Sequence, residues 1–257
     1  MSSPPAWPTP PTAIVTGGAS GIGLSIAQRL SAEGAAVAIF DLDGVAAKEA
    51  EDTIIASGGH AHGLAVDVTD RTRIDSAVAE VVLTLGSPTI LVNSAGLDGF
   101  GKFLDITADS WQKILAVNLT GTFDCCQAVV PHMIDAGWGR IVNISSSSAQ
   151  TGNPRMTHYS AAKAGVVGFT KALAQELGPS GITVNTIPPG FIDTPMLRRT
   201  EKRGFLGPGV EAAEATTPVR RVGRPDDIAA ACAYLVRDEA GYITGQIIGV
   251  NGGRTIG

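Results

Sequence analysis

Short runs of apolar residues alternate with longer amphipathic segments along most of the chain. Near-continuous apolar runs predict buried strands at residues 13–16, 36–40, 63–66, 90–93, 140–144, 183–187 and 246–250. Apolar residues with a helical period predict helices at residues 21–33, 45–57, 71–85, 108–136, 159–177 and 225–236. Strands of this kind that alternate with helices form a parallel sheet covered on both faces. The sequence therefore predicts an α/β, doubly wound fold around a seven-stranded parallel sheet.

The predicted elements run through residues 12–257 without a dividing linker, so we expect a single domain. Residues 1–11 contain five prolines, which predicts a disordered tail rather than a signal peptide or a membrane anchor. Residues 194–217 form a long stretch without a predicted element. Because that stretch is charged and contains glycine, we expect it to act as a lid over the active site.

Composition and charge narrow the class of protein. Charged residues make up 17% of the chain and the net charge is −5, which argues against disorder and against a nucleic-acid partner. The sequence shows no run of about 20 apolar residues that would span a bilayer, so we expect a soluble, cytoplasmic protein without a membrane partner. The three cysteines have neither disulfide nor metal-ligand spacing. His60 and His62 have only Asp67 as a further ligand nearby, so no metal site is predicted.

A glycine-rich turn follows the first predicted strand. Gly17, Gly21 and Gly23 stand between that strand and the first predicted helix. Glycines at this spacing permit a tight turn and a close approach of the backbone to a phosphate, and the helix offers its N-terminal N–H groups to a pyrophosphate. The sequence therefore predicts a dinucleotide site at the carboxyl end of the first strand.

Asp41 follows the second predicted strand, 24 residues beyond Gly17. A carboxylate there accepts hydrogen bonds from the ribose hydroxyls of NAD and repels the 2′-phosphate of NADP. We therefore predict NAD, preferred over NADP. The alternative is that Asp41 and Asp43 merely cap a turn and the next helix. Asp67, followed by Val68, ends the third strand and either contacts adenine or stabilises a turn.

Tyr159 and Lys163 stand four residues apart at the start of a predicted helix, so both side chains lie on one face. An ammonium group beside a phenol favours the phenolate, and we expect Lys163 to make Tyr159 a stronger acid than free tyrosine. Ser146 precedes Tyr159 by 13 residues, within a run of four serines in which Ser147 and Ser148 are the other candidates.

These motifs occur in an order that resembles the short-chain dehydrogenase/reductase family in its single-domain Rossmann form, and especially its 3-oxoacyl-thioester reductases and secondary-alcohol dehydrogenases. The resemblance covers residues 12–252. The motifs are Thr16-Gly17-x3-Gly21-x-Gly23, Asp67, Asn93-Ser94-Ala95-Gly96, Asn118, Ser146, Tyr159-x3-Lys163, and Asn185 followed by Pro189-Gly190.

The resemblance implies an NAD(H)-dependent oxidoreductase that interconverts a secondary alcohol and a ketone. Tyr159 would be the general acid and base, Lys163 would bind the nicotinamide ribose, and Ser146 would bond the substrate oxygen. Asn118 would anchor a water that links Lys163 to solvent, or else bond to the backbone as an ordinary buried amide. The implied cofactor contacts are Gly17, Ser20, Gly21, Ile22, Gly23, Asp41, Asp67, Val68, Asn93, Ala95, Gly96, Tyr159, Lys163, Pro189, Gly190, Ile192 and Thr194.

Two positions depart from the family pattern. Ser94 stands where the family usually has asparagine, and we expect cofactor binding to survive because serine is also small and polar. Pro188 makes the Pro188-Pro189-Gly190 segment stiffer than usual, which would restrict the hinge of the lid.

The predicted substrate pocket is mostly apolar, with a few hydrogen-bonding groups. Its candidate residues are Ser146, Gln150, Asn153, Met156, His158, Tyr159, Phe191, Met196 and Leu197. His158 either takes part directly or packs at the helix start. Arg155 either reads a carboxylate or phosphate of the substrate or is solvated.

The predicted lid carries Arg198, Arg199, Lys202 and Arg203. They form either a solvated helix face or a docking site for the phosphates of coenzyme A or of a phosphopantetheine carrier.

Two other functions stay open, a non-catalytic NAD-binding protein and an epimerase-like reaction on a nucleotide sugar. The second usually requires a C-terminal substrate domain for which this chain leaves little room. The family resemblance also implies a homotetramer, with the predicted helices 108–136 and 159–177 as candidate interfaces.

Overall fold

The computed structural model describes Trp7, residues 9–207 and residues 209–256. Its centre is a sheet of six parallel strands in the order β3-β2-β1-β4-β5-β6. The strands are β1 (Thr12–Thr16), β2 (Ala36–Asp41), β3 (His60–Ala65), β4 (Pro88–Asn93), β5 (Gly139–Ile144) and β6 (Ile182–Ile187). The chain moves outward from β1 to β3 and then crosses to the other side of β1, so the topology switches between β1 and β4. In open parallel sheets, ligands bind at the carboxyl ends of the strands at such a point.

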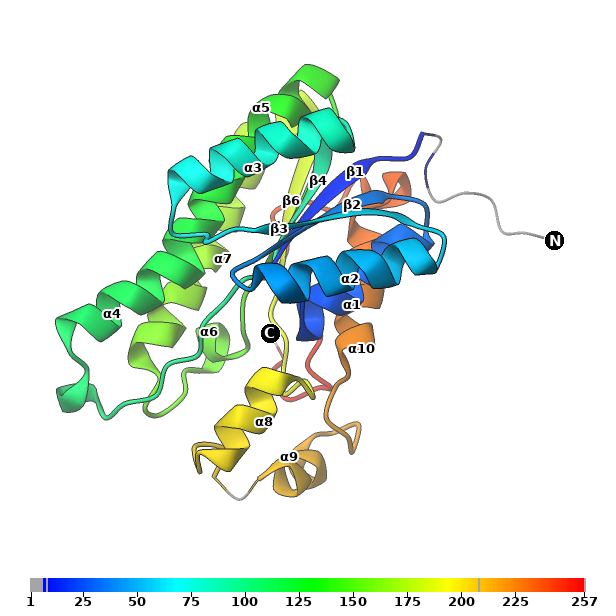
Figure 1. Cartoon of the computed structure of the whole chain (residues 1–257). Coiled ribbons are helices and arrows are strands. Elements are labelled where there is room, and N and C mark those ends of the chain that lie inside the picture. The colour runs from blue at the N-terminus through cyan, green and yellow to red at the C-terminus, as the bar shows by residue number, and fades with distance from the viewer. Residues whose placement is uncertain (1–6, 8, 208, 257) are drawn as a thin grey trace.

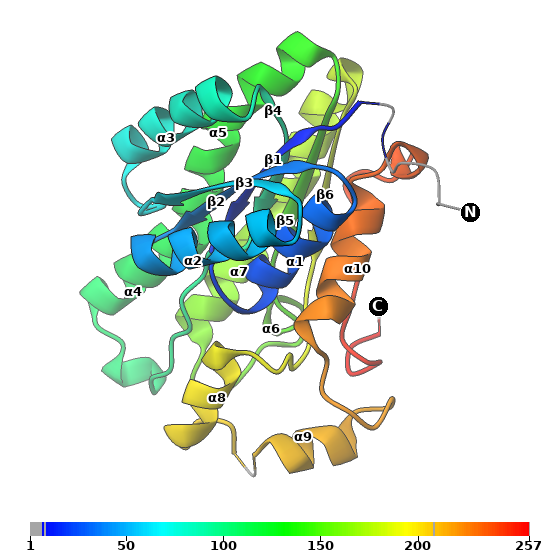
Figure 2. The same cartoon turned by 45° about the vertical axis from the view of Figure 1, so that its right-hand side comes forward.

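Helices cover both faces of the sheet (Figure 1). One layer consists of α1 (Gly21–Ala32), α2 (Gly44–Ala56) and α10 (Pro225–Leu235). The opposite layer consists of α3 (Arg71–Thr84), α5 (Gly121–Ala136) and α7 (Thr157–Leu177). Each layer encloses its own cluster of buried apolar side chains. Figure 2 shows the two layers of helices and the sheet between them from a second side. The expected doubly wound α/β fold is confirmed.

The seventh strand predicted at residues 246–250 does not form. The segment lies beside β6, but it makes only isolated bridges, between Thr186 and Ile247 and between Pro189 and Val250. Thr186 donates to the carbonyl oxygen of Gln246 and accepts from the N–H group of Ile248, on the two sides of Ile247. The next bond of a parallel ladder would be donated by the N–H group of residue 188. Because Pro188 has no N–H group, the ladder stops there.

The disordered tail predicted for residues 1–11 is wrong at its C-terminal end. Trp7 is 4% exposed, and its Nε1 donates to the carbonyl oxygen of Val236 at 3.3 Å. Pro11 accepts a hydrogen bond from the N–H group of Ala36. A tryptophan ring buries a large apolar area, and here it packs with the core of the α10 layer. Residues 1–6 and 8 of the predicted tail lie outside the described residues.

The helix predicted at residues 108–136 is continuous but not regular. The α-helix α4 (Ala108–Leu115) passes into a π-helical turn (Ala116–Thr120) and then into α5. Asn118 lies in this π-helical turn and is fully buried. Such wide turns occur inside α-helices, frequently at functional sites.

The same segment is the one described helix that is long and apolar enough to cross a membrane by length and composition alone. The helix Ala108–Ala136 contains an 18-residue window with a mean hydropathy of 1.2, and 39% of that window is buried. This corrects the expectation that the chain holds no segment of that length and hydropathy. Cys125, Val129 and Met133 of α5 pack into the core beneath the sheet, so the helix has the contacts of a core helix.

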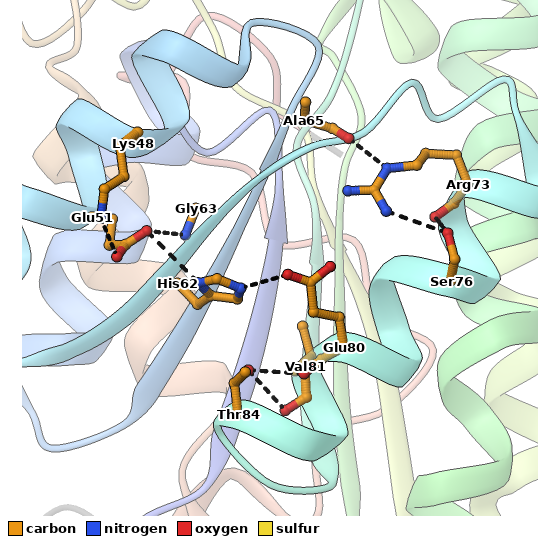
Figure 3. A network of polar contacts seen from close by, with 10 residues as sticks. All are labelled: Lys48, Glu51, His62, Gly63, Ala65, Arg73, Ser76, Glu80, Val81 and Thr84. Atoms are coloured by element: carbon orange, nitrogen blue, oxygen red, sulfur yellow. Dashed lines mark hydrogen bonds and ion pairs between the residues drawn. The ribbon is translucent and has the colours of Figure 1, made fainter.

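A polar cluster anchors the edge strand β3 (Figure 3). His62 of β3 lies between two carboxylates, with Nε2 2.9 Å from Glu80 of α3 and Nδ1 3.7 Å from Glu51 of α2. Glu51 also accepts hydrogen bonds from Lys48 and from the N–H group of Gly63. Burial raises the pKa of the Glu51 carboxyl, but the bonds from Lys48 and Gly63 outweigh it and lower that pKa overall. Within the part of the chain that the structure describes, no group of three or more His, Cys, Asp or Glu side chains could hold a metal ion.

Candidate active site

A cleft of about 1350 Å³ runs along the carboxyl ends of the strands. It is lined by the turn after β1 and by the residues that follow β2 and β3. The start of α7 and residues 194–207 also line it, and Thr194 lies close to Gly21 of the glycine-rich turn. The helices α8 (Pro195–Lys202) and α9 (Val210–Thr216) lie together below the sheet in Figures 1 and 2.

The glycine-rich turn requires glycine for steric reasons. Gly17 has a φ of +62°, and a Cβ there would lie 2.8 Å from the Cα of Ala95. A Cβ on Gly23 would overlap the carbonyl oxygen of Gly17, so the first turn of α1 packs directly on the glycine-rich loop. The N-terminus of α1 lines the cleft, and the side chains of Thr194 and Pro195 lie close to Gly21. These features fit the pyrophosphate of a dinucleotide.

Asp41 is held in place by the backbone of two segments. One carboxylate oxygen accepts from the N–H group of Ala19 at 3.0 Å, and the other accepts from that of Asp43 at 3.1 Å. Asp43, rather than Asp41, caps α2, since it accepts from the N–H groups of Val45 and Ala46. Both caps of the alternative are therefore present, since Asp41 stabilises the turn and Asp43 caps α2. Asp41 also lines the cleft, so these contacts leave it available to a cofactor.

Asp67 has the turn-stabilising role that the sequence left open, and the contact with adenine stays a prediction. It accepts from the N–H group and the hydroxyl of Thr69 at 2.8 and 2.7 Å, which stabilises the turn after β3, and it also lines the cleft beside Val68. The remaining cofactor candidates that line the cleft are Ser20, Gly21, Ile22, Ala95, Gly96, Pro189, Gly190, Ile192 and Thr194.

The proposed catalytic side chains meet near the start of α7. Ser146 follows β5, and Tyr159 and Lys163 occupy adjacent turns of α7. The Nζ atom of Lys163 lies 5.9 Å from the centre of the Tyr159 ring and donates to the carbonyl oxygen of Ile144 at 2.9 Å. All three side chains line the cleft.

The effect expected of Lys163 on the acidity of Tyr159 is not what the structure shows. Burial and, to a smaller extent, the charge of Asp98 raise the pKa of Tyr159, a hydrogen bond with Ser146 lowers it, and the net pKa is about 12. Burial also lowers the pKa of Lys163 to about 8. The prediction considered only the neighbouring charge, whereas removal of both groups from water has the larger effect.

Hydrogen-bond partners distinguish the serines of the run and show which of their hydroxyls contacts Tyr159. The hydroxyl of Ser145 accepts a hydrogen bond from Thr186 of β6 at 3.0 Å. Ser146 interacts with Tyr159 and shares a hydrogen bond of 2.8 Å with Ser148. Ser146 is thus the serine whose hydroxyl contacts the tyrosine.

Two predicted asparagines do not line the cleft. Asn93 donates to Asn143 at 2.9 Å, so its side chain joins β4 to β5 inside the sheet. Asn118 donates to the carbonyl oxygens of Leu97 and Ile114 and accepts from the N–H group of Leu97. Its contacts match the alternative of a backbone-bonded buried amide, although its oxygen and the Nζ atom of Lys163 both lie close to Gly96.

Some of the predicted substrate residues line the cleft and others do not. Those that line the cleft, besides Ser146 and Tyr159, are Asn153, Met156, Phe191, Met196 and Leu197. Gln150 is exposed on the short helix α6 (Ser148–Thr151) outside the cleft. His158 is 1% exposed and packs against Gly99, and desolvation lowers its pKa, so the packing alternative holds for this residue.

Sequence reasoning missed several cleft residues on irregular segments. Phe100 lies in the loop after β4 and Phe205 follows α8, and their rings stack with centroids 4.9 Å apart and an interplanar angle of 3°. Asp98 also lines the cleft and accepts from Thr200 of α8 at 2.9 Å. Single residues in loops follow no periodic pattern, so the sequence held no signal for these contacts.

Comparison with known proteins agrees with this arrangement. The family model described as enoyl-(acyl carrier protein) reductase matches residues 17–255. The chain is 41% identical to the short-chain reductase protein NovJ of Streptomyces niveus, over 94% of this chain and 93% of that protein. It is 38% identical to the 3-oxoacyl-[acyl-carrier-protein] reductase FabG of Thermotoga maritima, over 95% and 97%. A variant of the actinorhodin polyketide ketoreductase, solved with NADPH, superimposes with a TM-score of 0.91 at 36% identity and covers 95% of this chain and 97% of that one.

The fold and the site define an oxidoreductase that uses a nicotinamide cofactor. The chain belongs to the short-chain dehydrogenase/reductase family.

Proposed function

We propose that the protein is an NAD(H)-dependent oxidoreductase that interconverts a secondary alcohol and a ketone, with Tyr159 as the general acid and base. One observation carries the proposal: the hydroxyls of Ser146 and Tyr159 and the ammonium of Lys163 lie in the same cleft as a glycine-rich turn that fits a dinucleotide. The bound nicotinamide would supply or accept the hydride.

The chain's own residues handle the proton and the developing charge. Because the pKa of Tyr159 is about 12, its phenol is protonated at neutral pH and can donate to a ketone oxygen. Ser146 would donate to the same oxygen and stabilise the negative charge that develops there. Lys163 would stabilise the phenolate left on Tyr159, since its ammonium lies beside that ring.

Residues 194–217 would act as a lid. Thr194 caps α8, and Thr200 of that helix bonds to Asp98 across the cleft. This hydrogen bond would join the lid to the loop after β4 and reduce the access of water to the reacting groups.

The preference for NAD rests on Asp41. Its two backbone hydrogen bonds hold a carboxylate where the adenosine ribose would lie, and a 2′-phosphate would meet that charge. We expect Asp41→Asn to lower kcat/KM for NADH by about tenfold and to raise it for NADPH, because one acceptor for the backbone remains while the repulsion is removed. Steady-state kinetics with both cofactors measure this ratio. An unchanged ratio would contradict the role of the charge.

The pKa of Lys163 predicts the pH dependence of ketone reduction. The group carries its charge below a pH of about 8 and loses it above, so its help to the forming phenolate fades as pH rises. We expect kcat/KM for reduction to be constant near pH 7 and to fall as pH rises through about 8. In Lys163→Arg, which stays cationic, the falling limb should move to higher pH. A limb that does not move would assign it to another group.

A panel of carbonyl and alcohol substrates tests the proposed activity itself. It would contain secondary alcohols, hydroxysteroids and 3-oxoacyl thioesters, each assayed in both directions with NAD(H) and NADP(H). Hydride transfer with any of them supports the proposal. Tight binding of NAD without hydride transfer to any of them would favour the non-catalytic alternative.

Exposed apolar side chains support a proposed homotetramer. Phe123 of α5 is 43% exposed and packs edge-on against Phe169 of α7, with ring centroids 6.3 Å apart. Ile134 of α5 is also exposed. A Phe123→Glu variant should dissociate the assembly, which sedimentation measures directly; an unchanged mass would exclude this face. The three cysteines are free and buried, which supports a reducing, cytoplasmic compartment.

A further inference from the structure

The part of the cleft near Tyr159 has an aromatic wall. Phe100 and Phe205 stack face to face, and both line the cleft. Met156, Leu197 and Leu206 add apolar surface around them. This lining favours a substrate with an apolar or aromatic body.

Arginine side chains border this wall. The guanidinium carbon of Arg155 lies 5.2 Å from the ring centre of Phe205, and that of Arg203 lies 5.3 Å from it. Arg155 itself lines the cleft, as does Arg199 of α8. An aromatic ring beside a guanidinium excludes water from one side of the group, which strengthens its interaction with an anion.

The backbone of Arg155 adopts an unusual conformation. Its φ of +67° lies in the left-handed region, which an arginine enters at an energetic cost. The N–H group of Gly101, beside Phe100, donates to the carbonyl oxygen of Arg155 at 2.8 Å and holds this conformation. Only three residues separate Arg155 from Tyr159. The loop therefore ties the position of this arginine to the start of the helix that carries the proton donor.

The lid arginines differ in their partners. Arg198 makes two hydrogen bonds to Asp193, at 2.7 and 2.8 Å, and a third to Glu201, so its charge is neutralised locally. Among the described residues, Arg155 and Arg199 have no carboxylate within ion-pairing distance. Asp98, the carboxylate on the loop after β4, is bonded to Thr200. The four lid cations are thus not equivalent, and only Arg199 of these four lines the cleft.

We propose that Arg155 and Arg199 form an anion subsite, and that the substrate combines an apolar or aromatic body with an anionic oxygen group. The inference rests on the proposed hydride-transfer function, because it places the anion in the same cleft as Tyr159. Guanidinium groups bind carboxylates and phosphates in the same bidentate way. The anion is either the substrate's own carboxylate or a phosphate of a pantetheine thioester.

Binding measurements test the subsite without any turnover. The probes are 4-phenylbutanoate and the neutral 4-phenylbutanamide, titrated calorimetrically into the enzyme saturated with NADH, and acetyl-CoA and its N-acetylcysteamine counterpart, titrated in the same way. We expect wild type to bind the charged member of one pair about tenfold more tightly than its neutral partner. Arg155→Gln and Arg199→Gln should each abolish that preference. Arg198→Gln, a matched change on the same helix, should keep it.

Kinetic measurements then identify the source of the anion. One pair of substrates is 3-benzoylpropanoate and its methyl ester, and the other is acetoacetyl-CoA and its N-acetylcysteamine thioester. If the carboxylate is recognised, Arg155→Gln and Arg199→Gln lower kcat/KM about tenfold for the acid but leave the ester unchanged. If the phosphate is recognised, the same loss appears for the coenzyme A thioester alone.

Two outcomes would overturn the subsite: wild type that does not distinguish charged from neutral probes in either pair, or glutamine variants that weaken both members of a pair equally. A charge preference in binding without hydride transfer to any substrate would instead retain the subsite and contradict the proposed function.

Discussion

Tyr159→Phe is expected to lower kcat for ketone reduction by about 10³-fold while the affinity for NADH changes little. The variant removes only the hydroxyl that would donate the proton, and general acid catalysis commonly contributes about 10²–10⁴-fold. The ring still fills its place in α7 beside Lys163, so the cofactor end of the cleft should stay intact. Stopped-flow or steady-state assays with NADH measure kcat, and fluorescence titration measures the affinity for NADH.

The chain offers a matched control for that experiment. Tyr242 is fully exposed and distant in sequence from α7, so Tyr242→Phe should behave as wild type in every assay. A Tyr159→Phe variant that retains more than about a tenth of wild-type kcat would remove Tyr159 from the proposed mechanism.

Gly23→Ala is expected to abolish measurable dinucleotide binding and to lower the free energy of unfolding by about 2–3 kcal/mol. The added methyl group would overlap the carbonyl oxygen of Gly17, and it would push α1 away from the turn that is proposed to hold the pyrophosphate. Urea denaturation measures the change in stability, and calorimetric titration with NAD measures the loss of binding.

Gly168→Ala provides the corresponding control on α7. A Cβ at Gly168 meets nothing within 4 Å, so this substitution should leave binding unchanged and should stabilise the helix by up to about 1 kcal/mol. Wild-type affinity for NAD in Gly23→Ala would mean that the glycine-rich turn does not hold the cofactor.

Most of the fold could be predicted because its elements are strongly patterned. Strands β1, β2, β4, β5 and β6 occur where near-continuous apolar runs predicted them. Strand β3 begins at His60, earlier than predicted, and the prediction missed this start because His60 and His62 interrupt the apolar pattern. Such polar residues can occur in β3 because it lies at the edge of the sheet. The predicted seventh strand has the right pattern, but Pro188 on the neighbouring chain segment removes the hydrogen bond that would extend the ladder.

The site residues also fall into two groups, those that the local sequence could place and those that depend on residues distant in the sequence. Gly17, Gly23 and Asp41 could be placed from sequence because their roles depend on the local turn and on the strand that precedes each of them. Asn93, Gln150 and His158 could not, because the direction in which each side chain points depends on neighbours distant in sequence. Trp7 belongs with these, since its burial depends on Val236 at the other end of the chain.

By itself the sequence determined the layered α/β fold, the glycine-rich turn and the placement of Tyr159 and Lys163 on one helix face, because period, spacing and glycine content are local properties of the chain. The choice of Ser146 from its run of serines needed the tertiary contacts. The tertiary structure decided how acidic these groups are and which charges stay free. Burial sets the pKa of Tyr159 at about 12 and that of Lys163 at about 8, and it reverses the shift that their spacing alone suggested for the tyrosine. The tertiary structure also decided that the charge of Arg198 is neutralised by Asp193 and Glu201, while Arg199, the next residue, lines the cleft. Solvent exposure and ion pairing arise only when distant segments meet, so no local pattern in the sequence could have specified them.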